Sequence, residues 1–443
     1  MRSTTTADRT GGCGCPGHDT DAGPSRSGFS RRSFLKRGAA VAAATSLTGT
    51  QLATQLAFAS SPAYAGDTVV VLSFRGGFDG LSVVVPRGDA NFAALRPNIR
   101  VPDAALLSTG DSRFGLHPGL APLLPFWQAG TFGAVHAVGQ DNPSRSHFEA
   151  MEEMERAAPG SSLRTGWIDR LLTTRGQGTS FQGCQVGSTT VASAFIGPSP
   201  ELGMYRIDDF NLSGSSSSAD LASWDAALRG LNSGAPAVIG DPVATTLGAL
   251  AQTGALTDAG YTEANGAVYD TNSDLAMSLR DVARLIKANI GLQMAAVDYG
   301  DWDMHSGLAV GTLDPSQGWM FDKMTELAGA LAAFYTDLGP TLMAKTTLIT
   351  LSEFGRRVEE NGSHGVDHGH GNAVLLMGGG IVGGQVHGVW PGLSDSALND
   401  GDLDVRTDYR NLLGEILVKR CGAGSVSSVF PGLTYAPIGI AHP

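Results

Sequence analysis

The sequence predicts an α/β fold: one doubly wound, mostly parallel sheet with helices on both faces. Short apolar runs rich in Val, Ile, Leu and Thr alternate with amphipathic stretches between residues 292 and 377, and this alternation favours parallel strands joined by right-handed crossovers. Several of these runs stop abruptly at polar, glycine-rich segments, as expected at the carboxyl edge of such a sheet. With 443 residues, 42% of them hydrophobic, the chain can bury a sizeable core.

The expected elements can be placed in order along the chain. Apolar runs that end at turn-forming residues indicate strands at 67–74, 130–138, 292–297, 346–351 and 373–377. Stretches of helix formers, two of them with a clear apolar face, indicate helices at 147–158, 274–290, 321–338 and 408–419. Residues 160–265 carry weaker patterns, and we expect helices and loops there. No repeat or linker divides residues 66–443, so we expect one domain.

The first 65 residues have the features of an export signal. Ser30–Lys36 (Ser-Arg-Arg-Ser-Phe-Leu-Lys) matches a twin-arginine motif, a weakly apolar stretch follows from Gly38 to Ala59, and Ala63–Ala65 supplies a cleavage pattern. We therefore expect the twin-arginine translocase to export the chain as a periplasmic or extracellular protein that begins near Gly66. The stretch is too weakly apolar to predict a stable membrane anchor. Because this route moves folded proteins, a cofactor can be inserted before export.

Charge and cysteine content narrow the function classes. Removing residues 1–65 takes away seven basic and three acidic side chains, so the net charge falls from −12 to −16. That acidity disfavours nucleic acid and anionic membrane surfaces as partners. Two of the four cysteines, Cys13 and Cys15, fall in the signal segment. Cys184 and Cys421 could form one disulfide in an oxidising compartment, and the sequence leaves their pairing open.

Metal-ligand side chains follow several of the predicted strands. They are Asp79, His147, Asp303, His305, Glu353, Asp367, His368 and His370. Because the carboxyl ends of parallel strands meet at one edge, we expect a shared cleft there, although Asp79 could equally make a local Asx-turn. Carboxylate and imidazole ligands suit a divalent ion such as Zn²⁺, Mn²⁺ or Mg²⁺. Such an ion would polarise a phosphoryl or sulfuryl oxygen and activate a nearby water or hydroxyl.

The start of the helix at 147–158 offers an anion site beside these ligands. Ser146 and Glu149 have the spacing of a capping box, which is a purely structural role. A serine at a helix N-terminus also faces free amides and the positive end of the helix dipole, where phosphate-like groups bind. Arg145 would add a bidentate contact to the same anion.

Four motifs together resemble a known family. Arg-Gly-Gly-Phe-Asp-Gly-Leu at 75–81, Ser-Arg-Ser-His-Phe at 144–148, Asp-Trp-Asp-Met-His at 301–305 and the segment from Ser352 to Gly369 are similar to the secreted family catalogued as domain of unknown function 1501. The resemblance runs from about residue 68 to 432. That family is in turn similar to the alkaline phosphatase and sulfatase superfamily. The resemblance implies a doubly wound α/β fold with one or two metal ions.

The resemblance also implies roles for single residues. By it, Asp79 would match the metal-binding Asp after the first strand, and Ser146 the nucleophile at a helix start. Asp303 and His305 resemble a metal box with a shortened spacing. Glu353 would stand for the Asp of a Ser-Asp-His-Gly motif, and His368 or His370 would match its final metal His.

One position departs from the superfamily pattern. Phe354 stands where the superfamily has a metal-binding His, and an aromatic hydrocarbon ring cannot ligate a metal. Three outcomes stay open: one metal remains, another residue such as His147 or His364 substitutes, or the site is degenerate.

Two functions from different classes follow. The first is a metal-dependent hydrolase or transferase acting on a small-molecule or polymeric phosphate or sulfate ester, with Ser146 as nucleophile and Arg145 holding the substrate charge. Its ion would be held by Asp79, Asp303, His305, Glu353, His368 and His370. The second is a non-catalytic secreted protein that binds a metal or a polyanion in the same cleft. A surface assembly protein is a third class, for which the sequence contains no positive feature.

Overall fold

The computed structural model describes residues 66–141, 144–176, 180–199, 201–212, 218–308 and 317–443. The twin-arginine motif and its cleavage pattern lie outside the described residues, so export and the domain boundary at residue 65 stay predictions. In the part of the chain that the structure describes, no helix is both long and apolar enough to cross a membrane.

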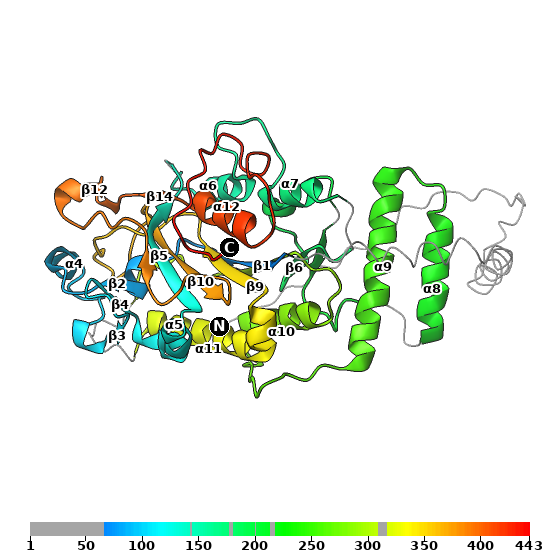
Figure 1. The fold of residues 1–443 in the computed structure, drawn as a ribbon, viewed down its shortest axis with the longest axis horizontal. Coiled ribbons are helices and arrows are strands. Elements are labelled where there is room, and N and C mark those ends of the chain that lie inside the picture. The colour runs from blue at the N-terminus through cyan, green and yellow to red at the C-terminus, as the bar shows by residue number, and fades with distance from the viewer. Residues whose placement is uncertain (1–65, 142–143, 177–179, 200, 213–217, 309–316) are drawn as a thin grey trace, which may run out of the picture. The chain divides into compact units, whose positions relative to one another are not determined.

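A nine-stranded mixed sheet forms the centre of the fold (Figure 1). In spatial order its main path is β11, β5, β10, β9, β1, β8, β6 and β7, with β14 paired to β5. The strands are β1 Thr68–Phe74, β5 Phe132–Gly139, β6 Gly183–Val186, β7 Leu202–Met204, β8 Met294–Tyr299, β9 Thr346–Leu351, β10 Asn372–Gly378, β11 Val386–His387 and β14 Thr407–Asp408. The predicted strands are therefore present, with ends that differ by a few residues.

Strand direction differs from the prediction at one place. β1 pairs in parallel with β8 and β9, as expected, but β10 is antiparallel to both of its neighbours, β9 and β5. The connection from β9 to β10, residues 352–371, contains no helix. Without a crossover the chain returns from the edge it has just reached, so β10 must run the opposite way. Its amino end consequently lies at the same edge as the carboxyl ends of β1, β8 and β9.

Helices cover both faces of the sheet. Alternate residues of β1 belong to different buried clusters: Val70 and Leu72 face one helical layer, and Val69 and Val71 face the other. The first layer contains α5 Leu124–Gln128, α10 Asp274–Lys287 and α11 Trp319–Met343; the second contains α6 His147–Arg156, α7 Trp167–Thr174 and α12 Tyr409–Lys419. The predicted α/β class with two helical layers is confirmed.

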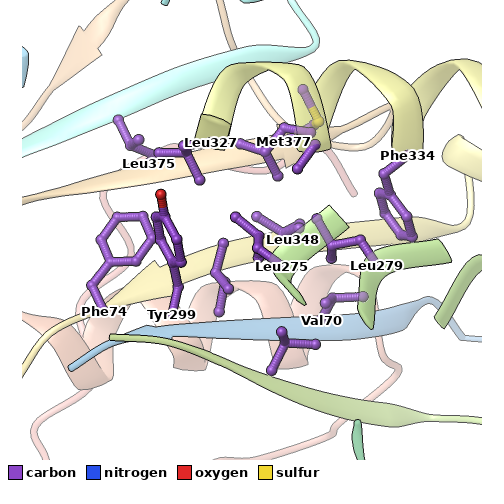
Figure 2. Packing of buried hydrophobic residues seen from close by; sticks show 14 of the residues in the cluster. Val70, Phe74, Leu275, Leu279, Tyr299, Leu327, Phe334, Leu348, Leu375 and Met377 are labelled. Atoms are coloured by element: carbon purple, nitrogen blue, oxygen red, sulfur yellow. The ribbon is translucent and has the colours of Figure 1, made fainter. Parts of the chain in front are cut away.

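Figure 2 shows the packing of the first layer. Leu275 and Leu279, one turn apart on α10, project onto the sheet beside Val70, and Leu327 and Phe334 reach it from α11. Each of these side chains is at most 3% exposed. Burying an aliphatic side chain of this size contributes roughly 2 kcal/mol. The spacing of apolar residues that predicted these two helices therefore corresponds to the faces they bury.

The remaining elements are short or lie beside the main sheet. The helices are α3 Gly80–Val83, α4 Ala90–Leu95, α8 Ser218–Leu231 and α9 Ala237–Ala259, with 3-10 turns at Asp103–Ala105, Pro118–Leu123, Ser193–Phe195 and Asp395–Ala397. The strands are β2 Val84–Pro86, β3 Leu107–Ser108, β4 Phe114–Leu116, β12 Leu398–Asn399 and β13 Asp402–Leu403. Inside α11, Gly339 has a φ of 65° and precedes Pro340, so the regular helix breaks at its predicted end.

The disulfide that the sequence left open is not formed. Cys184 is a free, buried thiol. It belongs to the cluster under the first helical layer, whereas Cys421 belongs to the cluster under the second. Burial raises the pKa of the Cys184 thiol to about 12, so this side chain acts as a small apolar group.

Two buried histidines predict acid sensitivity of the fold. Burial lowers the pKa of His117 and of His136 from 6.5 to about 4. Because the folded pKa lies below the unfolded one, their contribution to stability is complete above pH 6.5 and is lost as pH falls toward 4. We expect the free energy of unfolding to drop over this window by at most about 3 kcal/mol per histidine.

Chemical denaturation at pH 7.5 and pH 5 measures this drop. His136→Asn should reduce the difference between the free energies of unfolding at the two pH values. An equal difference in the variant and the wild type would contradict the role of His136 in acid sensitivity. His442, which is exposed, provides the control position.

Candidate metal centre

Four imidazole and carboxylate side chains converge at the carboxyl edge of the sheet. They come from the start of α6, from the loop that follows β8 and from the loop that precedes β10. The Oδ1 atom of Asp303 lies 3.4 Å from Nε2 of His147, 3.0 Å from Nε2 of His305 and 3.2 Å from Nε2 of His368. His147, Asp303 and His368 each offer one ligand atom, and these atoms all lie within 4.8 Å of one another. We call His147, Asp303, His305 and His368 together the centre.

Carboxylates hold two of the imidazole rings from behind. Nδ1 of His147 lies 2.8 Å from Glu353 Oε1, and Nδ1 of His305 lies 2.7 Å from Asp367 Oδ1. The amide of Asn361 donates to the same Asp367 oxygen at 3.1 Å. Because a carboxylate can only accept, the proton of each neutral ring belongs on Nδ1, which leaves the Nε2 lone pair available to a metal ion.

The third ring is held in the same way by a backbone group. Nδ1 of His368 lies 2.8 Å from the carbonyl oxygen of Arg145. Its Nε2 is therefore also an acceptor, and it lies only 3.0 Å from Nε2 of His305. Two lone pairs facing each other at this distance repel, and a cation between such nitrogens removes that repulsion.

The centre also contains an orphaned polar atom. Nε2 of His147 is buried and has no hydrogen-bond partner. An unpaired buried acceptor costs about 1–3 kcal/mol, and coordination of an ion would satisfy it. The donor set, nitrogen-rich with one carboxylate, thus fits a divalent metal.

The Asp303 carboxylate stays ionised. Burial by itself raises the pKa of Asp303, but the hydrogen bond and positive charge of Arg356, together with the neighbouring imidazoles of His368 and His147, hold the pKa well below its ordinary value. Arg356 donates from Nη2 to Asp303 Oδ1 at 2.8 Å. Protons therefore do not compete with a metal for this ligand near neutral pH.

Glu353 takes a different position from the predicted one. Its side chain is 1% exposed at the end of β9. Oε1 accepts from the Gly76 amide at 2.8 Å and contacts His147, while Oε2 accepts from the Ser352 hydroxyl at 3.1 Å. Glu353 thus orients the His147 ring instead of supplying one of the converging ligand atoms.

Asp79, predicted as a metal ligand, is occupied elsewhere. Its carboxylate is buried and accepts from Arg96 Nη1 at 2.6 Å, from Arg96 Nη2 at 2.9 Å and from the Ser82 hydroxyl at 2.5 Å. Three donor atoms, two of them on one bidentate guanidinium, leave this group committed to an internal ion pair. The assignment of Asp79 to the metal is therefore corrected. Its side chain makes no helix cap either.

Of the two candidate C-terminal histidines, His368 reaches the centre and His370 does not. Nε2 of His370 lies 2.8 Å from the Gln140 carbonyl, and its Nδ1 lies 3.4 Å from the Asn399 amide. His364, weighed as a substitute for the missing superfamily histidine, is exposed with a φ of 56°. Of the two residues weighed for that position, His147 lies at the centre and His364 does not.

Phe354 forms an apolar wall behind the imidazoles. Its ring is buried, and its centroid lies 4.9 Å from both the His147 and the His368 rings. A Cβ on Gly77 would come within 2.7 Å of the Phe354 ring, and Gly77 has a φ of 72°. Phe354 thus limits the rotation of two ligand rings without itself coordinating.

Ser146 stands directly before α6, as predicted, but the capping box is not formed. Its backbone is extended, and its side chain makes no capping hydrogen bond. The Ser144 hydroxyl instead donates to Glu149 at 2.6 Å and accepts from the Ser146 amide at 3.1 Å. Ser146 is half-buried and directly precedes His147.

Arg145 is already paired. Its Nη2 atom donates to Asp402 Oδ2 at 2.7 Å and lies 4.0 Å from Asp400. The Asp402 side chain is 3% exposed and the Arg145 side chain 47% exposed. An anionic substrate would have to compete with Asp402 for this guanidinium.

Sequence reasoning missed the residues that position the ligands. Asn361 and Arg356 were not assigned, although Arg356 lies in the Ser-Glu-Phe-Gly-Arg-Arg motif, and Asp367 was grouped with the metal-ligand side chains and not recognised as a residue that orients one of them. Orientation of a ring by a carboxylate far along the chain has no local signature, so spacing alone could not reveal it.

We expect Asp79→Asn to lower the free energy of unfolding by about 3–5 kcal/mol, because it leaves the buried Arg96 guanidinium without its counter-charge. Bound metal per folded chain should stay at the wild-type value. Denaturation and elemental analysis measure the two quantities. Asp89→Asn is the matched control, since Asp89 caps α4 at a half-exposed position and Asn caps equally well. Loss of metal with unchanged stability would restore Asp79 to the metal site.

Comparisons with known proteins support the family resemblance over part of the chain. Residues 260–419 match the family model described as "Protein of unknown function (DUF1501)". That segment contains Asp303, His305, Glu353, His368 and His370, whereas the motifs before residue 260 lie outside it. A search of the curated proteins finds no match.

Among solved structures, one similar chain is the C-terminal periplasmic domain of EcEptC from Escherichia coli, in complex with Zn. The alignment covers 72% of this chain and 75% of that chain, at 9% identity and a TM-score of 0.30. The α/β assignment therefore rests on the sheet and its two helical layers, and the family resemblance rests on the match over residues 260–419.

Proposed function

We propose that this protein is an exported metal-dependent hydrolase of phosphate or sulfate esters. The observation that carries the proposal is the convergence of three Nε2 atoms on Asp303 Oδ1, with each ring fixed through its Nδ1. His147, Asp303 and His368 hold the ion, and His305 stands at the fourth position. Protein metal sites commonly use this arrangement, in which a hydrogen-bond acceptor behind each ring holds the Nδ1 proton.

The donor set selects among the candidate ions. Mg²⁺ prefers an octahedral shell of oxygen ligands, whereas imidazole nitrogen suits Zn²⁺ and also accepts Mn²⁺. A centre with three imidazoles and one carboxylate is therefore best matched to Zn²⁺. The bound ion would polarise the ester and lower the pKa of a neighbouring water or hydroxyl.

The chain's own groups supply the remaining parts of the reaction. Ser146 lies next to His147 at the free amides of α6, so its hydroxyl is the candidate nucleophile. Its oxygen would bond to phosphorus or sulfur as the ester bond to the leaving oxygen breaks, and its proton would pass to that oxygen, so the group leaves as an alcohol. Water would then cleave the bond to Ser146, which regains its hydroxyl proton as the phosphate or sulfate is released. Arg145 would hold the substrate charge once its guanidinium separates from Asp402.

A specific observation favours the alternative, a non-catalytic metal-binding protein. Asp79 and His370 are directed to other partners, so the second ion of a two-metal hydrolase has no ligands from them. The charge of Arg145 is already balanced by Asp402. A non-catalytic metal-binding protein would need only the four residues of the centre. Under both alternatives export rests on the twin-arginine motif.

Metal content and turnover separate the two functions. We expect the wild-type chain to hold close to one Zn²⁺, and Asp303→Ala or His147→Ala to hold little, because each removes a ligand. Aryl phosphate and aryl sulfate esters should be turned over by the wild type, and Ser146→Ala should lower kcat by at least about 100-fold.

Elemental analysis and ester assays measure these effects, with Ser144→Ala as the control for Ser146→Ala. Metal without turnover on either ester would favour the binder. Absence of metal from the wild type would contradict both functions.

The Arg145–Asp402 pair predicts a change in substrate affinity. Asp402→Asn removes the charge that competes for Arg145, so we expect KM for an anionic aryl ester to fall by several-fold while kcat changes less. Steady-state kinetics at constant ionic strength measures KM and kcat separately. Asp404→Asn, which affects the Arg406 ion pair instead, is the matched control. An unchanged KM would remove Arg145 from substrate binding.

A further inference from the structure

One buried arginine connects the loops that carry the centre. Arg356 is 1% exposed. Its Nε donates to the Gly77 carbonyl at 2.7 Å, and its Nη1 donates to the Val366 carbonyl at 3.0 Å. Its Nη2 contacts the carbonyls of Gly76 and Trp302. The guanidinium thus bridges the loop after β1, the loop after β8 and the loop before β10.

The same guanidinium reaches one ligand of the centre directly. Nη2 donates to Asp303 Oδ1 at 2.8 Å, the oxygen on which the three Nε2 atoms converge. The two side chains differ in exposure: that of Arg356 is 0% exposed and that of Asp303 is 49% exposed. The arginine therefore approaches from the protein side and leaves the open side of the carboxylate to the histidines.

The contact between Arg356 and Asp303 is an ion pair, and its charge matters for the centre. A buried guanidinium needs a counter-charge. Among the described residues, Asp303 is the carboxylate that lies within 4.0 Å of the Arg356 guanidinium. A carboxylate oxygen has two in-plane lone pairs. With one engaged by Arg356, the other remains for the side on which the three Nε2 atoms lie, so the carboxylate is oriented before an ion arrives.

We propose that Arg356 is the positioning residue of the centre: its guanidinium fixes Asp303 and the three loops in the metal-binding geometry. This inference rests on the proposed metal site and extends it. Arg356 does not touch an ion or a substrate, so its effect is on metal affinity through Asp303. Outer-shell partners of this kind change metal affinity by 10–100-fold.

Arg357 provides a matched control at the neighbouring position. Its side chain is 32% exposed and lies 3.7 Å from Asp402, and Nη2 contacts the Asp400 carbonyl. It has the same charge and shape as Arg356 but faces the β12–β13 turn. Substituting it tests whether loss of any arginine in this loop produces the same result.

The experiment is a calorimetric titration of the metal-free full chain with Zn²⁺. For Arg356→Lys, which retains the charge but not the planar fork, we expect Kd to rise by at least about 10-fold, and for Arg356→Met by more. Arg357→Lys should bind like the wild type. Circular dichroism and thermal unfolding of the metal-free proteins establish that each variant is folded. An unchanged Kd in folded Arg356→Lys overturns the proposal.

A second measurement needs no substitution at Arg356, in case its variants do not fold. In wild-type protein with ¹⁵N-labelled arginine, addition of Zn²⁺ should shift the Arg356 side-chain resonances and leave those of Arg357 unchanged, because only Arg356 shares a carboxylate with the ion. No shift at Arg356 on saturation with Zn²⁺ overturns the proposal. Failure of the wild type to bind Zn²⁺ would instead refute the metal site itself.

Discussion

The edge of the sheet is held together by two buried arginines, each paired with one aspartate. Arg96 binds Asp79 and the carbonyls of residues 357 and 358, and Arg356 binds Asp303 and four carbonyls from three loops. The loops have little regular structure of their own, and an unpaired buried carbonyl costs about 1–3 kcal/mol. The guanidinium donors satisfy these groups. The two pairs differ in exposure: the Asp79 side chain is 4% exposed and that of Asp303 is 49% exposed, so one carboxylate is structural and the other is open to a ligand.

The antiparallel direction of β10 completes the site. It brings the residues before β10 to the edge where β1, β8 and β9 end, so His368 meets Asp303 across 65 residues of sequence. The close approach requires glycine at two points. A Cβ on Gly365 would lie 2.2 Å from the backbone of His305, and one on Gly369 would lie 2.3 Å from the backbone of Arg356. Backbone contact at these glycines lets the ligand loops pack directly on each other.

The sequence predicted the fold class, the main strands and a cluster of metal-ligand side chains at one edge, because these depend on local periodicity and on the topology of α/β sheets. The partners of single side chains could not be predicted. Asp79 and Asp303 both follow buried strands, and only the distant Arg96 and Arg356 decide their roles. The direction of β10 was missed because an apolar run has the same pattern in either direction. The pairs Glu353–His147 and Asp367–His305 depend on the meeting of loops, which spacing does not encode.

The formal charges around the centre limit what it can do. A metal-ligating imidazole is neutral; with Asp303 balanced by Arg356, the carboxylates of Glu353 and Asp367 then give the group a formal charge of −2 before the ion is counted. A divalent cation brings this to zero, which favours its binding in a partly buried setting. The loaded centre then has no net positive charge to attract an anionic ester. Substrate binding must therefore depend on charge outside it, and Arg145, the nearest candidate in the sequence, is neutralised by Asp402. Whether the protein acts as a hydrolase or only binds metal consequently depends on the Arg145–Asp402 ion pair at the rim, and not on the ligands of the metal.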